Sequence, residues 1–324
     1  MPYGRRMLTA LGEAIIDLVA EGDRRFIAHP GGSPLNVAVG LGRLGQPVSL
    51  AARLSRDPFG QLFRAHIAES GVDPRHIVDA SEPSTLSVAT LDPDGVARYD
   101  FWTSGTSDWQ WTEAELAGVV ADEPDALHTG SLTLELEPGA GRIVDLLARV
   151  GTAGRTTISY DPNVRMAKLG PVEAGRAAVE RVVALAHLVK VSAEDLAWLY
   201  PGEEPVAAAT RWAAAGPELV VVTLGADGAV ALGPDRRAVH RDAPPVDVVD
   251  TLGAGDAFSS GLLAALAERG ALGRGKAGLA GVDLPAVLDR ATLVASLTCA
   301  RPGADPPTLA EVAEAENPRP NLLS

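Results

Sequence analysis

Apolar segments the length of β-strands alternate along most of this chain with segments whose apolar residues recur at the helical period. Strands are expected at Leu8–Ile16, Val48–Leu54, Ala126–His128, Thr157–Tyr160, Leu188–Val191 and Leu219–Leu224. Helices are expected at Leu35–Leu44, Gly60–Ser70, Glu113–Val120, Arg142–Val150, Glu173–Ala186, Val206–Ala215, Ala254–Arg269 and Pro285–Thr298. Strands that alternate with helices pack side by side with helices on both faces, so the order predicts an α/β fold with a mostly parallel central sheet.

One region lacks helices of its own. Thr85–Leu91 and Val96–Trp102 are strand-like and flank a turn at Asp92–Gly95, and Val19–Ala28 is also strand-like. These segments predict a small sheet that projects from the main domain. A plain surface hairpin is the alternative.

Composition and charge exclude several classes of partner. The 28 Lys and Arg residues against 42 Asp and Glu residues give a formal net charge of −14, which repels the backbone of nucleic acids. Cys299 is the only cysteine, which favours a reducing, cytoplasmic location, and its apolar neighbours predict a buried core residue.

The basic start Met1–Arg6 is not followed by a signal sequence, and no window reaches the ~18 apolar residues of a membrane span. After Ala304 the chain is rich in proline and acid, and its last residues are expected to be mobile.

The stretch from Asp250 to Phe258 carries the chemistry. Gly253, Ala254 and Gly255 precede Asp256 at the start of an expected helix, where backbone N–H groups converge on an anion. Asp256 could take a proton from a hydroxyl beside that anion, which suggests phosphoryl transfer. From the residues alone, an acid that only stabilises the helix N-terminus is an equal alternative.

Two other glycine patterns point to the wrong chemistry. Gly40–Gly45 fits the Gly-x-Gly-x-x-Gly dinucleotide pattern, but its glycines close a helix instead of opening one. Gly270–Lys276 nearly fits the phosphate-binding P-loop, but Ala277 stands where a metal-binding Ser or Thr is required. A nicotinamide-dependent oxidoreductase is therefore disfavoured, and Gly270–Lys276 is expected to be a surface loop.

Two motifs together resemble a known family. Asp-Thr-x-Gly-Ala-Gly-Asp-x-Phe at 250–258 and the Gly-rich stretch Gly31–Gly45 resemble the signatures of the ribokinase-like (PfkB) carbohydrate kinases, in the family's order. The resemblance covers about Leu11 to Ala304. It implies a single ribokinase-like domain over 1–324, with a three-layer α/β/α architecture. A small β-sheet lid, inserted from about 17–30 and 84–105, would close over the sugar and exclude water.

The resemblance also assigns roles to individual residues. Asp256 becomes the catalytic base, and Gly253, Ala254 and Gly255 form the anion hole. The residues expected to bind the sugar are Asp17, Gly31, Gly32, Asn36 and Arg165. Their alternatives are an exposed loop acid, ordinary turn glycines, a helix N-cap and a surface ion pair. Asp250 resembles a ligand of a monovalent cation such as K⁺, with a turn-stabilising role as the alternative.

The ATP site is expected along the second half of the chain. The residues that the resemblance places there are Asn163, Lys190, Ser192, Thr223, Gly225 and Gly228, with adenine near Ala295–Cys299. Family members organise Mg²⁺ through water with an Asn-x-x-Glu motif, whereas this chain has Ser192 followed by Glu194 and Asp195, and either acid could serve. The alternative for Ser192 is a helix cap, and for Thr223–Gly228 a plain hairpin.

The details are most like those of bacterial fructokinases. The features concerned are Leu11–Leu18, the Gly-Gly-Ser-Pro-Leu-Asn form of the first signature, and Trp102–Trp109. Ketodeoxygluconate kinases are the second candidate, but they commonly carry an Arg where Thr103 and Ser104 stand here, which favours a neutral sugar. Kinases of ribose or a nucleoside and a non-catalytic sugar sensor are further alternatives. ATP, a sugar and Mg²⁺, with K⁺ and a homodimer as open options, are the expected partners.

Overall fold

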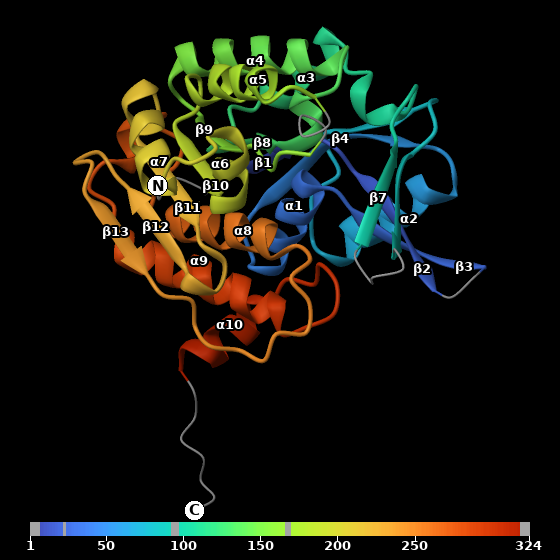
Figure 1. Ribbon diagram of the computed structural model, residues 1–324. Helices are drawn as coiled ribbons and strands as arrows, with labels where there is room; N and C mark the ends of the chain where they lie inside the picture. Colours follow the sequence, from blue (N-terminus) through green and yellow to red (C-terminus); the bar gives the residue numbers. More distant parts are fainter. Residues whose placement is uncertain (1–6, 22–23, 92–96, 166–169, 318–324) are drawn as a thin grey trace, which may run out of the picture.

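The computed structural model describes residues 7–21, 24–91, 97–165 and 170–317 (Figure 1). Three segments discussed above lie outside this part: the basic start Met1–Arg6, the turn Asp92–Gly95 and the last residues of the tail. None of the helices in the described ranges is long and apolar enough to cross a membrane.

The main sheet has nine strands within the described residues. All its neighbouring pairs are parallel except β11–β12 and β12–β13, which are antiparallel. In spatial order the strands are β13 (Ala238–Arg241), β12 (Ala229–Leu232), β11 (Leu219–Thr223), β10 (Leu188–Ser192), β9 (Thr157–Asp161), β8 (Ala126–Gly130), β1 (Leu8–Leu11), β4 (Val48–Ser55) and β5 (Ile77–Ala80). The central strands are buried along their whole length, because helices cover both faces.

Helices form a layer on each face of this sheet (Figure 1). Alternate residues of the strands point into two separate cores, so that Ala10 contributes to one and Leu11 to the other. The first core holds side chains of α1 (Ser33–Arg43), α2 (Pro58–Glu69), α8 (Ala254–Glu268), α9 (Leu284–Cys299) and α10 (Leu309–Glu316). The second holds those of α3 (Glu113–Val120), α4 (Gly139–Ala153), α5 (Val172–Val183), α6 (Ala193–Leu199) and α7 (Pro205–Ala215). The fold is the expected three-layer α/β/α arrangement.

A second, smaller sheet projects from one side of the body (Figure 1). Within the described residues it has four strands, in the order β3 (Arg25–Gly31), β2 (Ile15–Glu21), β6 (Thr85–Leu91) and β7 (Ala97–Trp102). The β2–β6 pair is parallel and the other two pairs are antiparallel. We call these four strands the small sheet. In the register of its strands, Asp17 lies opposite His29 on one side and Ser87 on the other.

Several expected elements need correction. The single strand expected at Leu8–Ile16 is two strands in different sheets, because the chain turns at Gly12, whose φ is 154°, and leaves the main sheet. The single strand expected at Val19–Ala28 is the end of β2 and the start of β3. Strands β5, β12 and β13 and helices α6 and α10 were not among the expected elements. Cys299 is half-buried and not fully buried.

Candidate active site

The two signature motifs meet at the N-termini of two helices. Ser33 and Asn36 lie in the first turn of α1, and Asp256 lies in the first turn of α8. Ser33 Oγ donates a hydrogen bond of 2.6 Å to Asp256 Oδ1, and Asn36 Nδ2 donates one of 2.8 Å to Asp256 Oδ2. Asp256 is 9% exposed, and these two donors fix the orientation of its carboxylate. This geometry suits a base that must accept a proton in one defined direction.

The turn before Asp256 is built for a close approach to the backbone. Gly253 has a φ of 74°, and a Cβ there would lie 2.5 Å from the Cβ of Ala304. The N–H of Ala254 donates to the carbonyl of Thr251 at 3.2 Å. The N–H groups of Gly255 and Asp256 therefore remain as donors of the first helical turn without an intrahelical acceptor. Together with the helix dipole they favour a negative group at this point.

Asp17 reaches toward the same place from the small sheet. It is half-buried, and burial is the main cause that raises the pKa of its carboxyl; the charge of Asp256 also raises this pKa, while Ser87 and His29 lower it. A Cβ on Gly31 would lie 2.3 Å from Asp17 Oδ2, and one on Gly32 would lie 2.6 Å from the Glu13 carbonyl oxygen. Gly31 thus leaves room for the carboxylate of Asp17, and Gly32 allows the backbone of Glu13 to pass close by where the small sheet joins α1.

A buried ion pair lies beside the helix turn. Lys190 Nζ is 2.8 Å from Asp161 Oδ2, with the two side chains 7% and 1% exposed. Burial raises the pKa of Asp161, and the Lys190 charge opposes this rise. Asp161 Oδ1 is buried without a hydrogen-bond partner. A Cβ on Gly255 would lie 3.0 Å from Lys190 Nζ, so the ammonium group is close to the predicted anion hole.

The carboxyl ends of parallel strands bring the remaining candidates to one edge of the sheet. Ser192 and Thr223 are register partners at the ends of β10 and β11. Ser192 caps α6 by accepting a 3.0 Å hydrogen bond from the N–H of Asp195, so its expected alternative role is present. Asp195 is 4% exposed and its charge acts on Asp161, whereas Glu194 is exposed to solvent. Of the two acids, Asp195 is therefore the one oriented toward the site.

The turn after β11 has the backbone that its glycines allow. Gly225 and Gly228 have φ values of 62° and 84°, and a Cβ on Gly228 would lie 2.1 Å from the carbonyl oxygen of Arg241. The turn begins the antiparallel return to β12, so the hairpin and the expected nucleotide-binding turn are the same structure. Its place next to Ser192 puts it on the edge that carries the other candidates.

The two residues after β9 differ in their surroundings. Asn163 is half-buried with a positive φ of 38°, and its carbonyl oxygen accepts a 3.4 Å hydrogen bond from Ser131 Oγ. Arg165 is exposed, and its guanidinium donates to the carbonyl of Val164 at 3.1 Å. Arg165 is therefore not brought into contact with Asp17, Asn36 or Asp256 by any described interaction.

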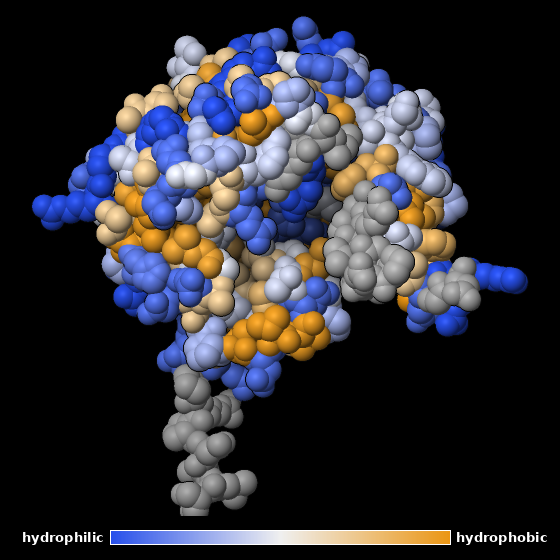
Figure 2. Space-filling model, in the orientation of Figure 1, coloured by the Kyte–Doolittle hydropathy of each residue, from blue (hydrophilic) through white to orange (hydrophobic). Residues whose placement is uncertain are grey.

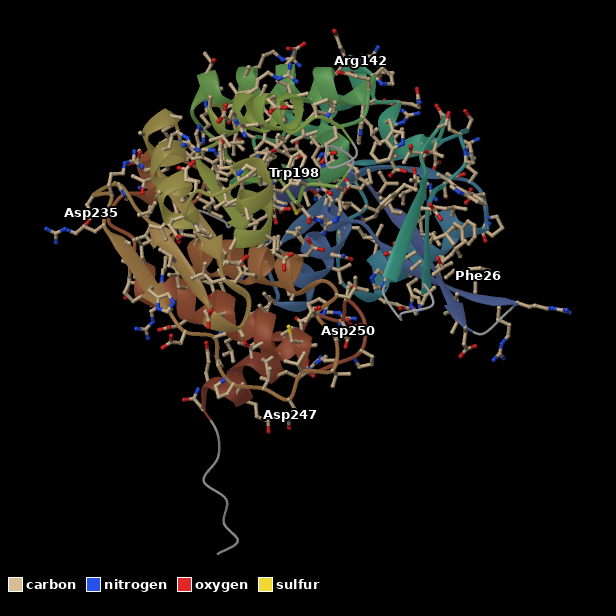
Figure 3. All side chains as sticks on the ribbon, in the orientation of Figure 1. Phe26, Arg142, Trp198, Asp235, Asp247 and Asp250 are labelled. Carbon is tan, nitrogen blue, oxygen red and sulfur yellow. The ribbon has the colours of Figure 1, made fainter. Side chains whose placement is uncertain are left out.

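Asp250 fastens the loop that leads to α8 (Figure 3). Its Oδ1 accepts from the N–H of Leu252 and its Oδ2 from the N–H of Gly303, both at 2.9 Å. Its own N–H donates to the carbonyl of Cys299 at 3.2 Å. Asp250 thus stabilises the loop, which is the alternative role given for it above. Binding of K⁺ would be a second role of the same residue. The described residues contain no group of three or more His, Cys, Asp and Glu side chains that could hold a metal ion.

Two functional candidates were missed by the sequence analysis. Ser33 contacts Asp256 directly, and its place inside the Gly31–Gly45 signature was the available signal. Asp161 pairs with Lys190, and its place two residues before Asn163, directly after an expected strand, could have indicated it. In both cases the sequence does not show which of the neighbouring polar side chains point inward.

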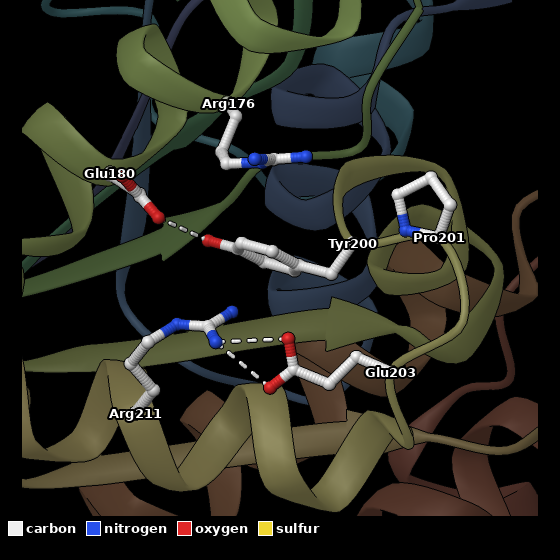
Figure 4. Close-up of a pocket in the computed structure, with 6 residues that line it drawn as sticks. All are labelled: Arg176, Glu180, Tyr200, Pro201, Glu203 and Arg211. Carbon is white, nitrogen blue, oxygen red and sulfur yellow. Dashed lines mark hydrogen bonds and ion pairs between the residues drawn. The ribbon is translucent and has the colours of Figure 1, made fainter.

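The hollow of the molecule lies between the body and the small sheet, and hydrophilic residues line it (Figure 2). A separate cavity of about 490 Å³ lies around Tyr200, near α5, α6 and α7 (Figure 4). Its polar side chains have partners: Tyr200 Oη donates to Glu180 at 2.6 Å, Arg211 contacts Glu203 at 2.9 Å, and Arg176 donates to the carbonyl of Leu199 at 2.7 Å. None of the residues that line this cavity belongs to the candidate active site.

Comparison with known proteins identifies the family of this chain. The model of the pfkB family carbohydrate kinases matches residues 5–311. A fructokinase of Klebsiella pneumoniae is 35% identical over 262 residues, which cover 80% of this chain and 84% of that protein. The crystal structure of a Xylella fastidiosa fructokinase with bound ATP superposes with a TM-score of 0.84 at 25% identity, covering 97% of this chain and 100% of that one.

A second similar solved structure contains bound ligands. A double mutant of the Vibrio cholerae fructokinase, in a form bound to fructose, ADP and potassium ion, superposes with a TM-score of 0.80 at 27% identity. The superposition covers 95% of this chain and 97% of that one. The match of the family model to nearly the whole chain, together with these relatives, leads to one conclusion. The chain belongs to the pfkB family of carbohydrate kinases and is an ATP-dependent carbohydrate kinase.

Proposed function

We propose that this kinase transfers the γ-phosphoryl group of ATP to a primary hydroxyl of fructose. The observation that carries the proposal is the Asp256 carboxylate, held by Ser33 and Asn36 beside two backbone N–H donors. The names of the relatives supply the sugar: the Klebsiella protein is a fructokinase, and the Vibrio structure holds fructose.

Each group has a place in the reaction. Asp256 accepts the proton of the hydroxyl as the hydroxyl oxygen bonds to the γ-phosphorus, and the bond from that phosphorus to the β–γ bridging oxygen breaks. The products are a sugar phosphate and ADP. The N–H groups of Gly255 and Asp256, with the Lys190 ammonium, would stabilise the negative charge on the transferring group. Asp17 would hold sugar hydroxyls in line with Asp256.

Mg²⁺ is part of the proposal. It would be carried chiefly by the phosphates and by water, with Asp195, which is buried and whose charge acts on Asp161, as the acid that orients those waters. Mg²⁺ would neutralise phosphate charge at this site. The orphaned Asp161 Oδ1 is a second acceptor that such water could use. K⁺, if the enzyme uses it, would be held near Asp250, whose carboxylate also fixes the loops of Leu252 and Gly303.

We also propose that the small sheet is a lid inserted from about 17–30 and 84–105 into a single domain. Asp17, a residue expected to bind the sugar, is on β2 of this sheet, so closure of the lid would move it toward Asp256. A lid that excludes water would protect ATP from hydrolysis while the sugar is bound.

The test is an assay of ADP release with fructose, ketodeoxygluconate, ribose and a nucleoside as acceptors, each with and without K⁺. The variant Asp256→Asn supplies the background. Fructose should give the largest kcat/KM, and phosphorus NMR of the product should show a primary phosphate ester. A higher kcat/KM with ketodeoxygluconate would move the assignment to an acidic sugar, and no ADP release with any acceptor would overturn the proposal.

A further inference from the structure

A fully buried carboxylate that has no place in the reaction lies where the small sheet leaves the body. Asp108 is 1% exposed and sits in the short helical turn at Ser107–Trp109, after β7. Its Oδ1 accepts a hydrogen bond of 2.8 Å from the N–H of Ala14. Its Oδ2 accepts one of 2.5 Å from Thr85 Oγ1. Burial of a carboxylate costs free energy unless hydrogen bonds compensate for the lost water. A buried carboxylate with such bonds holds the groups that donate them in place.

The two partners of Asp108 lie where two strands of the small sheet begin. Ala14 directly precedes β2, and Thr85 is the first residue of β6. Thr85 Oγ1 is also 2.6 Å from Thr106 Oγ1, which donates to the carbonyl of Thr103, the residue after β7. One carboxylate therefore links the starts of two strands and the end of a third.

A small hydrophobic cluster packs at this junction, and one of its residues lies on the same strand as Asp17. Ile15, Trp109 and Leu132 form a small core of their own, separate from the two cores of the main sheet. Ile15 is the register partner of both Thr85 and Gly31. Asp17 follows two residues later on the same face of β2, because side chains alternate along a strand. A displacement at the junction is therefore carried to Asp17 by the stiff, paired strand.

A second buried acid anchors the same corner to the main body. Glu13 is 1% exposed, and its Oε2 accepts a 3.0 Å hydrogen bond from the N–H of Thr133, in the segment after β8. Burial is the main cause that raises the pKa of Glu13, to about 8, with a further rise from the charge of Asp108. Ala14, between this anchored residue and β2, is the point held by Asp108.

We propose that Asp108 is a positioning residue that sets the small sheet, and with it Asp17, against the sugar site. The inference rests on the proposed function of the site. The base Asp256 is positioned by α1 and α8, and the nucleotide-side candidates by the ends of β10 and β11. None of these groups has a described contact with Asp108. Loss of Asp108 therefore acts on the sugar and on water exclusion, and not on ATP binding.

The test compares three variants with one control. Asp108→Ala and Thr85→Val each cut the tie to β6, and both should raise KM for the sugar about tenfold or more while KM for ATP stays within about twofold. Both should also raise the ratio of ADP to sugar phosphate formed, because water enters an imperfectly closed site. Asp108→Asn should be near the unaltered protein. Its amide oxygen can accept from Ala14, and its amide nitrogen can donate to Thr85.

Thr308→Ala is the matched control, since Thr308 caps α10 with its Oγ1 at 3.4 Å from the N–H of Glu311, and has no described contact with the small sheet. It should lower thermal stability without a change in either KM. An unchanged sugar KM and unchanged coupling in folded Asp108→Ala would overturn the inference. If Asp108→Ala does not fold, the same result in Thr85→Val would overturn it.

A readout without substrate separates this inference from the proposed function. Hydrogen exchange of residues 15–21, 25–31 and 85–91 should be faster in Thr85→Val than in the unaltered protein, with the strands of the main sheet unchanged. Thr308→Ala should leave those three segments protected. If the unaltered protein phosphorylates no sugar, the proposed function fails while this exchange result still decides the positioning role. Equal protection of the small sheet in Thr85→Val and the unaltered protein would contradict it.

Discussion

Ser33 Oγ donates a 2.6 Å hydrogen bond to Asp256 Oδ1, although 223 residues separate the two in the chain. The bond joins the first turn of α1 to the first turn of α8, so each signature motif completes the other. An acid that only capped a helix would have no need of a donor from a second helix. The contact therefore favours the reading of Asp256 as a directed base over that of an N-terminal charge.

Ser33→Ala removes one of the two donors that orient Asp256. A hydrogen bond to a charged group contributes ~1.5–3 kcal/mol, so kcat should fall about tenfold to a hundredfold. KM for ATP should stay nearly constant, because Ser33 contacts the base and not the nucleotide side. Steady-state kinetics with ATP and the sugar varied in turn check this. An unaltered kcat would show that Asn36 alone orients the base.

Gly31→Ala places a Cβ 2.3 Å from the present position of Asp17 Oδ2, so the carboxylate must move. We expect KM for the sugar to rise by about tenfold or more, since a displaced reader of the hydroxyls loses its hydrogen bonds. Gly118→Ala is the control: it lies in α3 with nothing within 4 Å of its added Cβ. This control should keep its kinetics and gain stability, because Ala is the better helix former. Equal sugar KM values in the two variants would contradict the role given to Asp17.

Lys190→Met leaves the carboxylate of Asp161 buried without its partner. Removing one member of a buried ion pair costs about 3–5 kcal/mol, so thermal unfolding should occur at a lower temperature and kcat should fall. The double variant Lys190→Met with Asp161→Asn should recover much of the stability, because no charge is then left buried. It should not recover kcat if the ammonium acts on the transferring phosphate. Recovery of both would make the pair purely structural.

Protonation of Glu13 should contribute to the change of the free energy of unfolding with pH. Its pKa is raised from 4.5 to about 8 in the folded protein, mainly by burial. The folded state then binds a proton that the unfolded state releases above pH 4.5, so this contribution to stability is present at low pH and is lost as the pH rises toward 8.

Denaturant unfolding from pH 5 to 8 measures the effect. Glu13→Gln should reduce the loss of stability with rising pH relative to the unaltered protein. Glu69→Gln, a change at an exposed acid, should leave the slope as it is. Identical slopes in the unaltered protein and in Glu13→Gln would show that Glu13 is charged throughout this range.

Local pattern was enough to predict the layers of the fold and the two helix starts of the site. It failed where a distant contact decides the backbone. Leu8–Ile16 is apolar enough for one strand, yet the Ala14 N–H bonds to Asp108, 94 residues away, and the chain leaves the main sheet. The pairing of Lys190 with Asp161 likewise requires β9 and β10 to be neighbours in the sheet. The order of the strands along the chain does not by itself show this. The sequence could not show which face of α6 is buried, and that face decides between Asp195 and Glu194.

The role of Asp256 as the base of phosphoryl transfer can be tested by ADP release from Asp256→Asn at saturating ATP and fructose, with ATP binding followed by calorimetry. General-base catalysis contributes about 10²–10⁴-fold, so kcat should fall by that order while the Kd for ATP stays within about twofold. A variant that binds ATP and turns over at nearly the unaltered rate would show that Asp256 is not the base.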